Sequence, residues 1–293
     1  MRKKTKLLAT VLCLAMFATM ALGSGSTDSD NSNGGLSGGN NNESNVNVTI
    51  EEQVLVEQNG LVVTAKEYVQ DSIWGDGIKL LLENTSDKTV TVSCNALIVN
   101  NYMISDLFVS EIAPGKKANE TMYLSSSQLN AAGINTVGQI EIYFHVYDSN
   151  SYDTIFDSDC VTIKTSEYAN MDTTADNIGI ELYNAGGIRI VGKAVDEESF
   201  WGTAIVLYCE NTSGKNVGVS VEEVSVNGFM INALYSNTVY NGKMSIDDIT
   251  IFSSDLEEND IEKIETVELK FHIYDADTYS TITDTDSITF TAN

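Results

Sequence analysis

An internal repeat constrains this sequence more than any other feature. Residues 47–166 can be aligned with 174–293 without a gap, so that Trp74 is aligned with Trp201. The two segments are identical at 38 of 120 positions. The clearest matches are Glu83–Ser86 with Glu210–Ser213 and Phe144–Asp148 with Phe271–Asp275. We interpret this agreement as duplication of one unit, and its period is the size of a domain. The sequence therefore predicts two domains, at 47–166 and 175–293, joined by a linker at 167–174.

Within each repeat the dominant pattern is alternation of apolar and polar residues, which is typical of half-buried strands. Leu61, Val63 and Ala65 share one face, and the alternation changes phase after Cys94, which predicts a β-bulge. Turn residues separate six to eight short strands in each repeat, among them Asn59-Gly60 and Pro114-Gly115. We expect an antiparallel β-sandwich in each repeat, with a barrel as the alternative.

One helical segment interrupts the strands of each repeat. The segments run from Ser126 to Ile134 and from Ser253 to Ile261. A serine at the start, with an acidic first turn in the second copy, predicts a short helix with a serine cap.

These motifs, in this order, resemble a bacterial family. The order is Trp-Gly, Glu-Asn-Thr-Ser, a valine-rich strand, the turn at Pro114–Lys117, the Ser-Ser-x-Leu helix and the Phe-His-[Val/Ile]-Tyr-Asp strand. The family comprises immunoglobulin-like, telokin-like domains of unknown function in secreted proteins and lipoproteins of Gram-positive bacteria. The resemblance covers both repeats and implies two tandem immunoglobulin-like antiparallel β-sandwich domains, each with one short helix. It implies no catalytic residues.

The charge of the chain excludes some partners. Its 42 acidic and 16 basic residues give a net charge of −26, and four of the basic residues lie in the first six positions. So acidic a chain repels phosphate groups, which excludes nucleic acids and anionic membrane surfaces as partners.

The N-terminal segment predicts export. A basic start at Met1–Lys6, an apolar run at Leu7–Leu22 and small residues at Ala21 and Gly23 form the pattern of a signal peptide at 1–23. An uncleaved anchor is the alternative, although the run is shorter than a typical membrane span. Ser24 stands where a lipoprotein needs cysteine, and 24–46 is a Gly/Ser/Asn-rich flexible linker. We expect a secreted protein that is not inserted in the membrane after cleavage, with association with the cell surface as a further option.

Three cysteines remain after residue 23: Cys94, Cys160 and Cys209. Cys94 and Cys209 fall in the apolar phase of their strands, which favours buried free thiols. A disulfide between Cys94 and Cys160 is the alternative.

The sequence contains no known catalytic motif. It has no Gly-x-Ser-x-Gly elbow, no zinc spacing and only two histidines. We therefore expect a non-catalytic extracellular binding or structural module, with an unknown protein or glycan as ligand. The alternative is a carbohydrate-active enzyme or its accessory domain.

Two sets of residues are candidates for a site. The first is a crowded acidic turn in each repeat, whose oxygen ligands suit calcium, the only cofactor that we consider. Its residues are Asp148, Asn150, Asp157, Asp159, Asp275, Asp277, Asp284 and Asp286. A solvated acidic turn is the simpler interpretation.

The second set is aromatic. Strand alternation places His145 with Tyr147, and His272 with Tyr274, on the polar face of equivalent strands. Such rings form a platform that can stack on a sugar or a peptide, and ordinary cross-strand pairing is the alternative. Trp74 and Trp201 are interpreted as packing anchors, or else as ligand contacts.

Overall fold

The alternating pattern produces strands that bury one face and expose the other. The computed structural model describes residues 47–71, 73–105, 107–171, 173, 175, 177–199 and 202–291. The predicted signal peptide at 1–23, the flexible linker at 24–46 and Trp201 lie outside the described residues. The chain divides by its contacts into 1–45 and 46–293, and the domain boundary at 167–174 stays a prediction.

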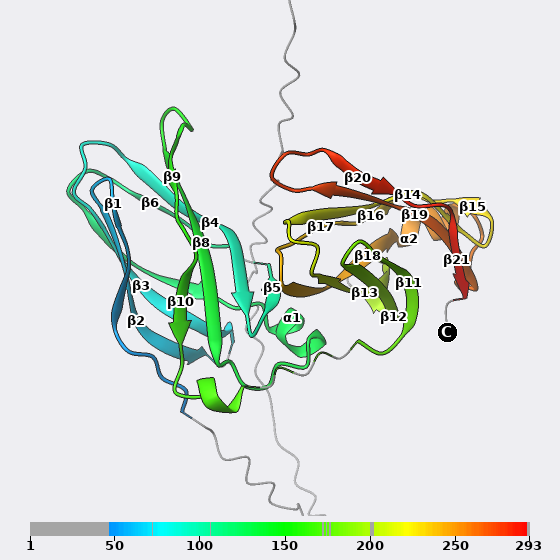
Figure 1. Cartoon of the computed structure of the whole chain (residues 1–293), viewed down its shortest axis with the longest axis horizontal. Coiled ribbons are helices and arrows are strands. Elements are labelled where there is room, and N and C mark those ends of the chain that lie inside the picture. Colours follow the sequence, from blue (N-terminus) through cyan, green and yellow to red (C-terminus); the bar gives the residue numbers. More distant parts are fainter. Residues whose placement is uncertain are drawn as a thin grey trace, which may run out of the picture. The chain divides into compact units, whose positions relative to one another are not determined.

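The first repeat, blue to green in Figure 1, folds as a series of short strands with one helix. Its elements are β1 (Gln53–Gln58), β2 (Leu61–Asp71), β3 (Gly75–Asn84), β4 (Val90–Val99), β5 (Tyr102–Ile104), β6 (Val109–Ile112), β7 (Lys117–Tyr123), α1 (Ser126–Ala131), β8 (Gln139–Asp148), β9 (Thr154–Asp157) and β10 (Val161–Lys164). A short 3-10 helix, η1 (Tyr168–Asn170), follows in the predicted linker.

The second repeat has largely the same order of elements, and most of them begin at the equivalent position of the repeat. They are β11 (Ile180–Ala185), β12 (Ile188–Ser199), β13 (Gly202–Asn211), β14 (Val217–Val226), β15 (Phe229–Met230), β16 (Ala233–Leu234), β17 (Ser236–Val239), β18 (Lys243–Phe252), α2 (Ser253–Glu258), β19 (Thr266–Asp275), β20 (Thr281–Asp284) and β21 (Ile288–Thr291).

Two layers of sheet form the sandwich in each repeat. In the first, β1-β2-β3-β7 form one sheet, and β8 lies between β10 and β4 in the other. In the second repeat, β11-β12-β13-β18 correspond to β1-β2-β3-β7, and the pair β14-β19 corresponds to β4-β8. The sheets are open, so the prediction of an all-β sandwich is confirmed and the barrel alternative is wrong.

Buried strand faces fill the space between the layers. Val63, Leu82 and Phe144 are fully buried in the first repeat, and Ile190, Cys209 and Phe271 are their counterparts in the second. The bulge predicted after Cys94 is confirmed, because the register of β4 against β8 shifts between Cys94 and Ala96.

Both helices are confirmed, but the serine cap is wrong. The residues before α1 and α2 are Ser125 and Phe252, and neither makes a side-chain capping hydrogen bond.

The Glu-Asn-Thr-Ser motif has a structural explanation. The buried Nδ2 of Asn84 donates to the carbonyls of Lys88 and Ile112, each at 2.8 Å, and its Oδ1 accepts from the backbone N–H of Ser86. Asn211 makes the equivalent bonds, to Lys215 and Val239, each at 2.7 Å. Each asparagine therefore ties the turn of its motif to a distant strand, and we call these residues the asparagine clamps.

One strand pair joins elements of the two repeats. In the described part of the chain, β5 and β18 are the strands that pair in parallel, with Met244 beside Tyr102 and Ser245 beside Met103. All other described pairs are antiparallel. As a result, Tyr208 and Ile246 pack in the same apolar cluster as Tyr102.

Candidate functional site

A histidine and an aspartate pair on the polar face of each repeat. His145 lies on β8, where Phe144 and Val146 point into the core, and His272 occupies the same position on β19. The Nδ1 of His145 lies 2.6 Å from Oδ1 of Asp157, and that of His272 lies 2.5 Å from Oδ1 of Asp284. The bond to His145 is the main cause that lowers the pKa of Asp157.

Beside each histidine lies a tyrosine ring, and a second tyrosine ring lies next to the first. The ring centroids of His145 and Tyr147 are 5.5 Å apart, and those of Tyr147 and Tyr152 are 6.2 Å apart. In the second repeat the distances are 5.4 Å from His272 to Tyr274 and 6.2 Å from Tyr274 to Tyr279. We call these two sets the aromatic rows. The sequence prediction that His and Tyr share a face is therefore confirmed in both repeats.

The last ring of each row is the most exposed. Tyr152 and Tyr279 are 77% and 79% exposed. Both have a positive φ, of 61° and 57°, which is uncommon for a tyrosine. Sequence reasoning missed both residues, although their identity across the repeat was a usable signal.

The bulge in β4 brings one more polar group to the first row. It leaves Asn95 unpaired in the register and exposed, with its Nδ2 donating to Oδ1 of Asp157 at 2.8 Å. A bulge redirects a side chain in this way. Asn95 was not a sequence candidate, because only the pairing of β4 with β8 places it there.

In the second row the position of Tyr274 depends on a glycine. Gly218 lies directly across the strand pair from Tyr274. A Cβ at Gly218 would lie 2.1 Å from the Cζ of the ring, so the ring covers the glycine backbone. The first repeat has Thr91 at this position, and its Oγ1 lies 2.7 Å from the Oγ of Ser149.

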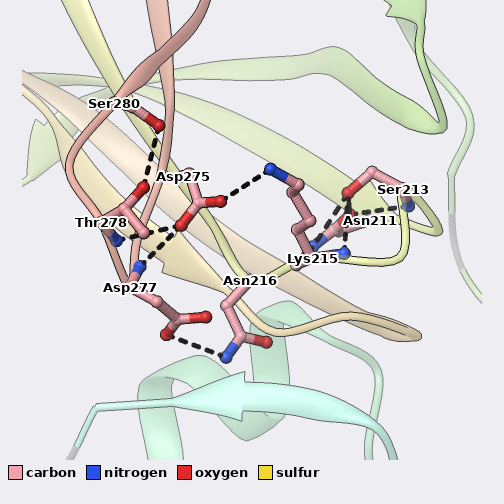
Figure 2. A network of polar contacts seen from close by, with 8 residues as sticks. All are labelled: Asn211, Ser213, Lys215, Asn216, Asp275, Asp277, Thr278 and Ser280. Atoms are coloured by element: carbon pink, nitrogen blue, oxygen red, sulfur yellow. Dashed lines mark hydrogen bonds and ion pairs between the residues drawn. The ribbon is translucent and has the colours of Figure 1, made fainter.

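The carboxylate of the first aspartate in each acidic turn binds a lysine and backbone N–H groups of the same turn. Oδ2 of Asp275 accepts from Nζ of Lys215 at 2.9 Å, and its Oδ1 accepts from the backbone N–H groups of Asp277 and Thr278 (Figure 2). The ion pair with Lys215 is the main cause that lowers the pKa of Asp275 to about 2. Its counterpart Asp148 pairs with Lys88 at 3.0 Å, and the backbone N–H of Asn150 is the main cause of its lowered pKa.

The structure separates the predicted calcium ligands by their partners. Asp148 and Asp275 bind a lysine, Asp157 and Asp284 bind a histidine, and Asp277 accepts from Asn216 at 3.4 Å. Asp159 and Asp286 are exposed, and Asn150 contributes its backbone N–H to Asp148. Among the described residues, no three His, Cys, Asp or Glu side chains are grouped to hold a metal ion. Calcium binding stays a prediction.

Trp74 is not a packing anchor. It is 66% exposed, and its ring centroid lies 6.1 Å from that of Tyr123. The two rings line a groove of about 490 Å³ with Leu107 and Phe108.

The cysteines of the described residues form no disulfide. Cys209 is buried, Cys94 is partly buried and Cys160 is exposed, so the proposed Cys94–Cys160 disulfide is not formed. Burial raises the pKa of the Cys209 thiol to about 12, which keeps it protonated at neutral pH.

Comparison with known proteins gives a distant bacterial similarity. The chain matches no protein-family model and no curated protein. It is similar to a solved protein of unknown function from Porphyromonas gingivalis W83, at 10% identity over 74% of this chain and 90% of that one, with a TM-score of 0.21. That likeness carries no argument about function. In the described part of the chain, we find no helix with the length and apolar character of a membrane span.

Proposed function

We propose that this chain is an exported, non-catalytic binding module and that the two aromatic rows contact its ligand. The observation that carries the proposal is the repeated geometry of the rows. Three rings lie next to one another in each repeat, and the distance between the first two is 5.5 Å for His145–Tyr147 and 5.4 Å for His272–Tyr274. A row with an exposed tyrosine at its end offers a long apolar surface on an otherwise polar face.

The chemistry of the rows favours a neutral glycan as the ligand. Aromatic faces stack on the C–H face of a sugar ring, and the carboxylates of Asp157 and Asp284 can accept hydrogen bonds from its hydroxyl groups. Since the net charge is −26, the chain as a whole repels acidic polysaccharides and nucleic acids. A single ring contact is weak, so a chain-like ligand that engages both rows gains affinity from avidity.

The setting that we propose for this activity is outside the cell. The signal-peptide pattern at 1–23 and the flexible linker at 24–46 support export. The motif order supports membership of the immunoglobulin-like, telokin-like family as two tandem copies. Both statements are proposals, and N-terminal sequencing of the secreted protein, expected to begin at or near Ser24, tests the first of them.

A glycan array tests the ligand class. The purified chain is applied to an array of neutral and acidic glycans, alongside Tyr147→Ala, Tyr274→Ala and the double variant. We expect binding to neutral glycans, a weaker signal for each single variant and loss for the double variant. Tyr168→Ala, which alters an exposed tyrosine outside both rows, is the matched control. If the double variant binds as well as the unaltered chain, the rows are not the ligand surface.

The same glycans separate a binding module from an enzyme. Incubation with each bound glycan, followed by an assay for new reducing ends, should show no product. Release of reducing ends that persists after purification would favour the alternative, a carbohydrate-active enzyme.

A further inference from the structure

The junction between the repeats uses two different surfaces. β5 of the first repeat lies along the edge of β18 in the second, and the backbone N–H of Met244 donates to the carbonyl of Asn101 at 3.0 Å. Nζ of Lys243 lies 2.5 Å from Oε2 of Glu141, and both side chains are nearly buried. A contact between two unlike surfaces of equivalent units is heterologous, and such contacts repeat unless they close into a ring.

Each of these two surfaces recurs on the other repeat, where no strand of the described residues covers it. The counterpart of β18 is β7, which is the last strand of its four-stranded sheet. The counterpart of β5 is β15, which pairs only with β14 among the described strands. One repeat therefore keeps an open edge, and the other keeps a strand of the kind that covers it.

The exposure of the two equivalent strands differs strongly. Tyr102 of β5 is 3% exposed, whereas its counterpart Phe229 on β15 is 48% exposed. Met230 and Leu234 nearby are 67% and 60% exposed. Phe229 and Met230 are both on β15, and exposed apolar residues that gather in one place mark an interaction surface more often than scattered ones do.

The ion pair of the junction also has counterparts at the open ends. Glu141 corresponds to Glu268 and Lys243 to Lys116, with the same residue type in each case. Both Glu268 and Lys116 are exposed. The open ends thus carry opposite charges at the positions where the junction carries its ion pair.

We propose that a second copy of this chain docks on the first in the manner of the internal junction. β15 of one copy lies along the edge of β7 in the next, Phe229 and Met230 take the positions of Tyr102 and Met103, and Glu268 pairs with Lys116. Because the contact is heterologous, the product is a head-to-tail row of chains.

Three features make this contact weaker than the internal junction. The edge-to-face contact of Tyr143 with Tyr240, at 5.0 Å, has no counterpart, since Lys270 and Ala113 stand there. The copies also lack the covalent linker, which supplies a high effective concentration inside one chain. In addition, the net charge of −26 on each copy opposes association at low salt.

Sedimentation equilibrium of the purified chain at moderate salt tests the proposal. The protein concentration is raised from about 1 µM to about 1 mM. High concentrations are needed because two separate chains lack the effective concentration that the linker supplies inside one chain. We expect the average mass to rise continuously without stopping at a dimer. A chain that stays monomeric throughout, or that stops at a symmetric dimer, overturns the proposal.

Variants at the two ends separate this contact from general stickiness. Met230→Asp alters the covering strand and Lys117→Pro removes an N–H from the open edge, so each variant alone should be monomeric. Proline is tolerated on an edge strand whose N–H faces solvent. Mixed together, the two variants retain one intact surface each and should form a dimer that grows no further. Val54→Asp, which places a charge on an exposed apolar residue of β1, is the matched control and should associate like the unaltered chain.

The charges provide a second test. Glu268→Lys reduces the net negative charge, so association would strengthen if only general repulsion mattered. The proposal requires instead about a tenfold weakening from either Glu268→Lys or Lys116→Glu, and recovery in the double variant, where the pair is reversed. Stronger association of Glu268→Lys, or no recovery in the double variant, overturns the assigned pair.

Discussion

The two repeats keep the same internal bonds and differ where a neighbour covers them. Both have the asparagine clamp, the lysine–aspartate turn, the histidine–aspartate pair and the aromatic row. They differ at one sheet edge, because β5 covers β18 in the second repeat and no described strand covers β7 in the first. They also differ in the residue opposite the middle tyrosine, which is Thr91 in the first repeat and Gly218 in the second. Local hydrogen bonds therefore follow the duplicated sequence, whereas the burial of a residue follows its position in the folded chain.

The largest effect is expected at the asparagine clamps. Asn84→Ala and Asn211→Ala each remove two hydrogen bonds to carbonyl groups, one of them buried, and the bond that the side chain accepts from the turn, so each should lower the free energy of unfolding by on the order of 3 kcal/mol. Chemical denaturation monitored by circular dichroism measures this. The exposed Asn135→Ala is the control and should change stability by under about 0.5 kcal/mol. A clear difference between the two clamp variants would show that the repeats do not share this stabilising bond.

A smaller effect, confined to the second repeat, is expected at Asp247. Burial raises the pKa of this carboxyl to about 6, and it lines a cavity of about 270 Å³ with Met103 and Gln128. A carboxyl whose folded pKa lies above its unfolded value, about 3.9, destabilises the fold as pH rises from about 4 through 6. The stabilisation that Asp247→Asn gives relative to the unaltered chain should therefore be larger at pH 8 than at pH 4, by on the order of 2 kcal/mol.

Denaturation curves at the two pH values measure the Asp247 effect. Glu120→Gln changes the counterpart on β7, whose outer edge pairs with none of the described strands, and serves as the control. An equal response in both variants would mean that the covering of β18 does not cause the effect.

The lysine–aspartate turns should respond to acid by different amounts. Both aspartates have lowered pKa values, so the stability that they contribute is present above about pH 4 and is lost as pH falls. For Asp275 the loss extends to about pH 2. Lys215 is the main cause at Asp275, whereas backbone N–H groups lead at Asp148.

Lysine variants sharpen this contrast. Lys215→Met should raise the pKa of Asp275 most of the way to its usual value near 4, and Lys88→Met should raise that of Asp148 less. Carboxyl carbon chemical shifts in an NMR titration report both values. A larger rise at Asp148 would reverse the assignment of causes.

The smallest effect on stability is expected at Gly218. Gly218→Thr gives the second repeat the residue of the first and forces the ring of Tyr274 away from the strand. Because a side chain rather than backbone must move, we expect under about 1 kcal/mol of lost stability. Altered NMR signals of the Tyr274 ring, with those of Tyr147 unchanged, would confirm the displacement. Unchanged ring signals would show that the ring does not lie on Gly218.

Much of the fold could be predicted from the sequence, because strand alternation and turn residues act locally. The faces of β8 and β19, the bulge after Cys94 and both helices followed from pattern alone. The helix caps did not, because no side chain of Ser125 or Phe252 bonds the first turn. Of the site, His145 and Tyr147 were predicted together, while Asn95 was missed because it meets Asp157 only through paired strands.

What the sequence determined by itself is the repeat and the alternation within it, since these need only neighbours along the chain. The pairs His145–Asp157 and His272–Asp284 were not predicted, because only the pairing of β8 with β9 and of β19 with β20 brings each histidine to its aspartate. The tertiary structure alone decided that Tyr102 is buried while Phe229 is exposed, and that Asp247 is desolvated. Burial depends on which distant strand covers a residue, and two equivalent sequences in one chain do not have the same neighbours.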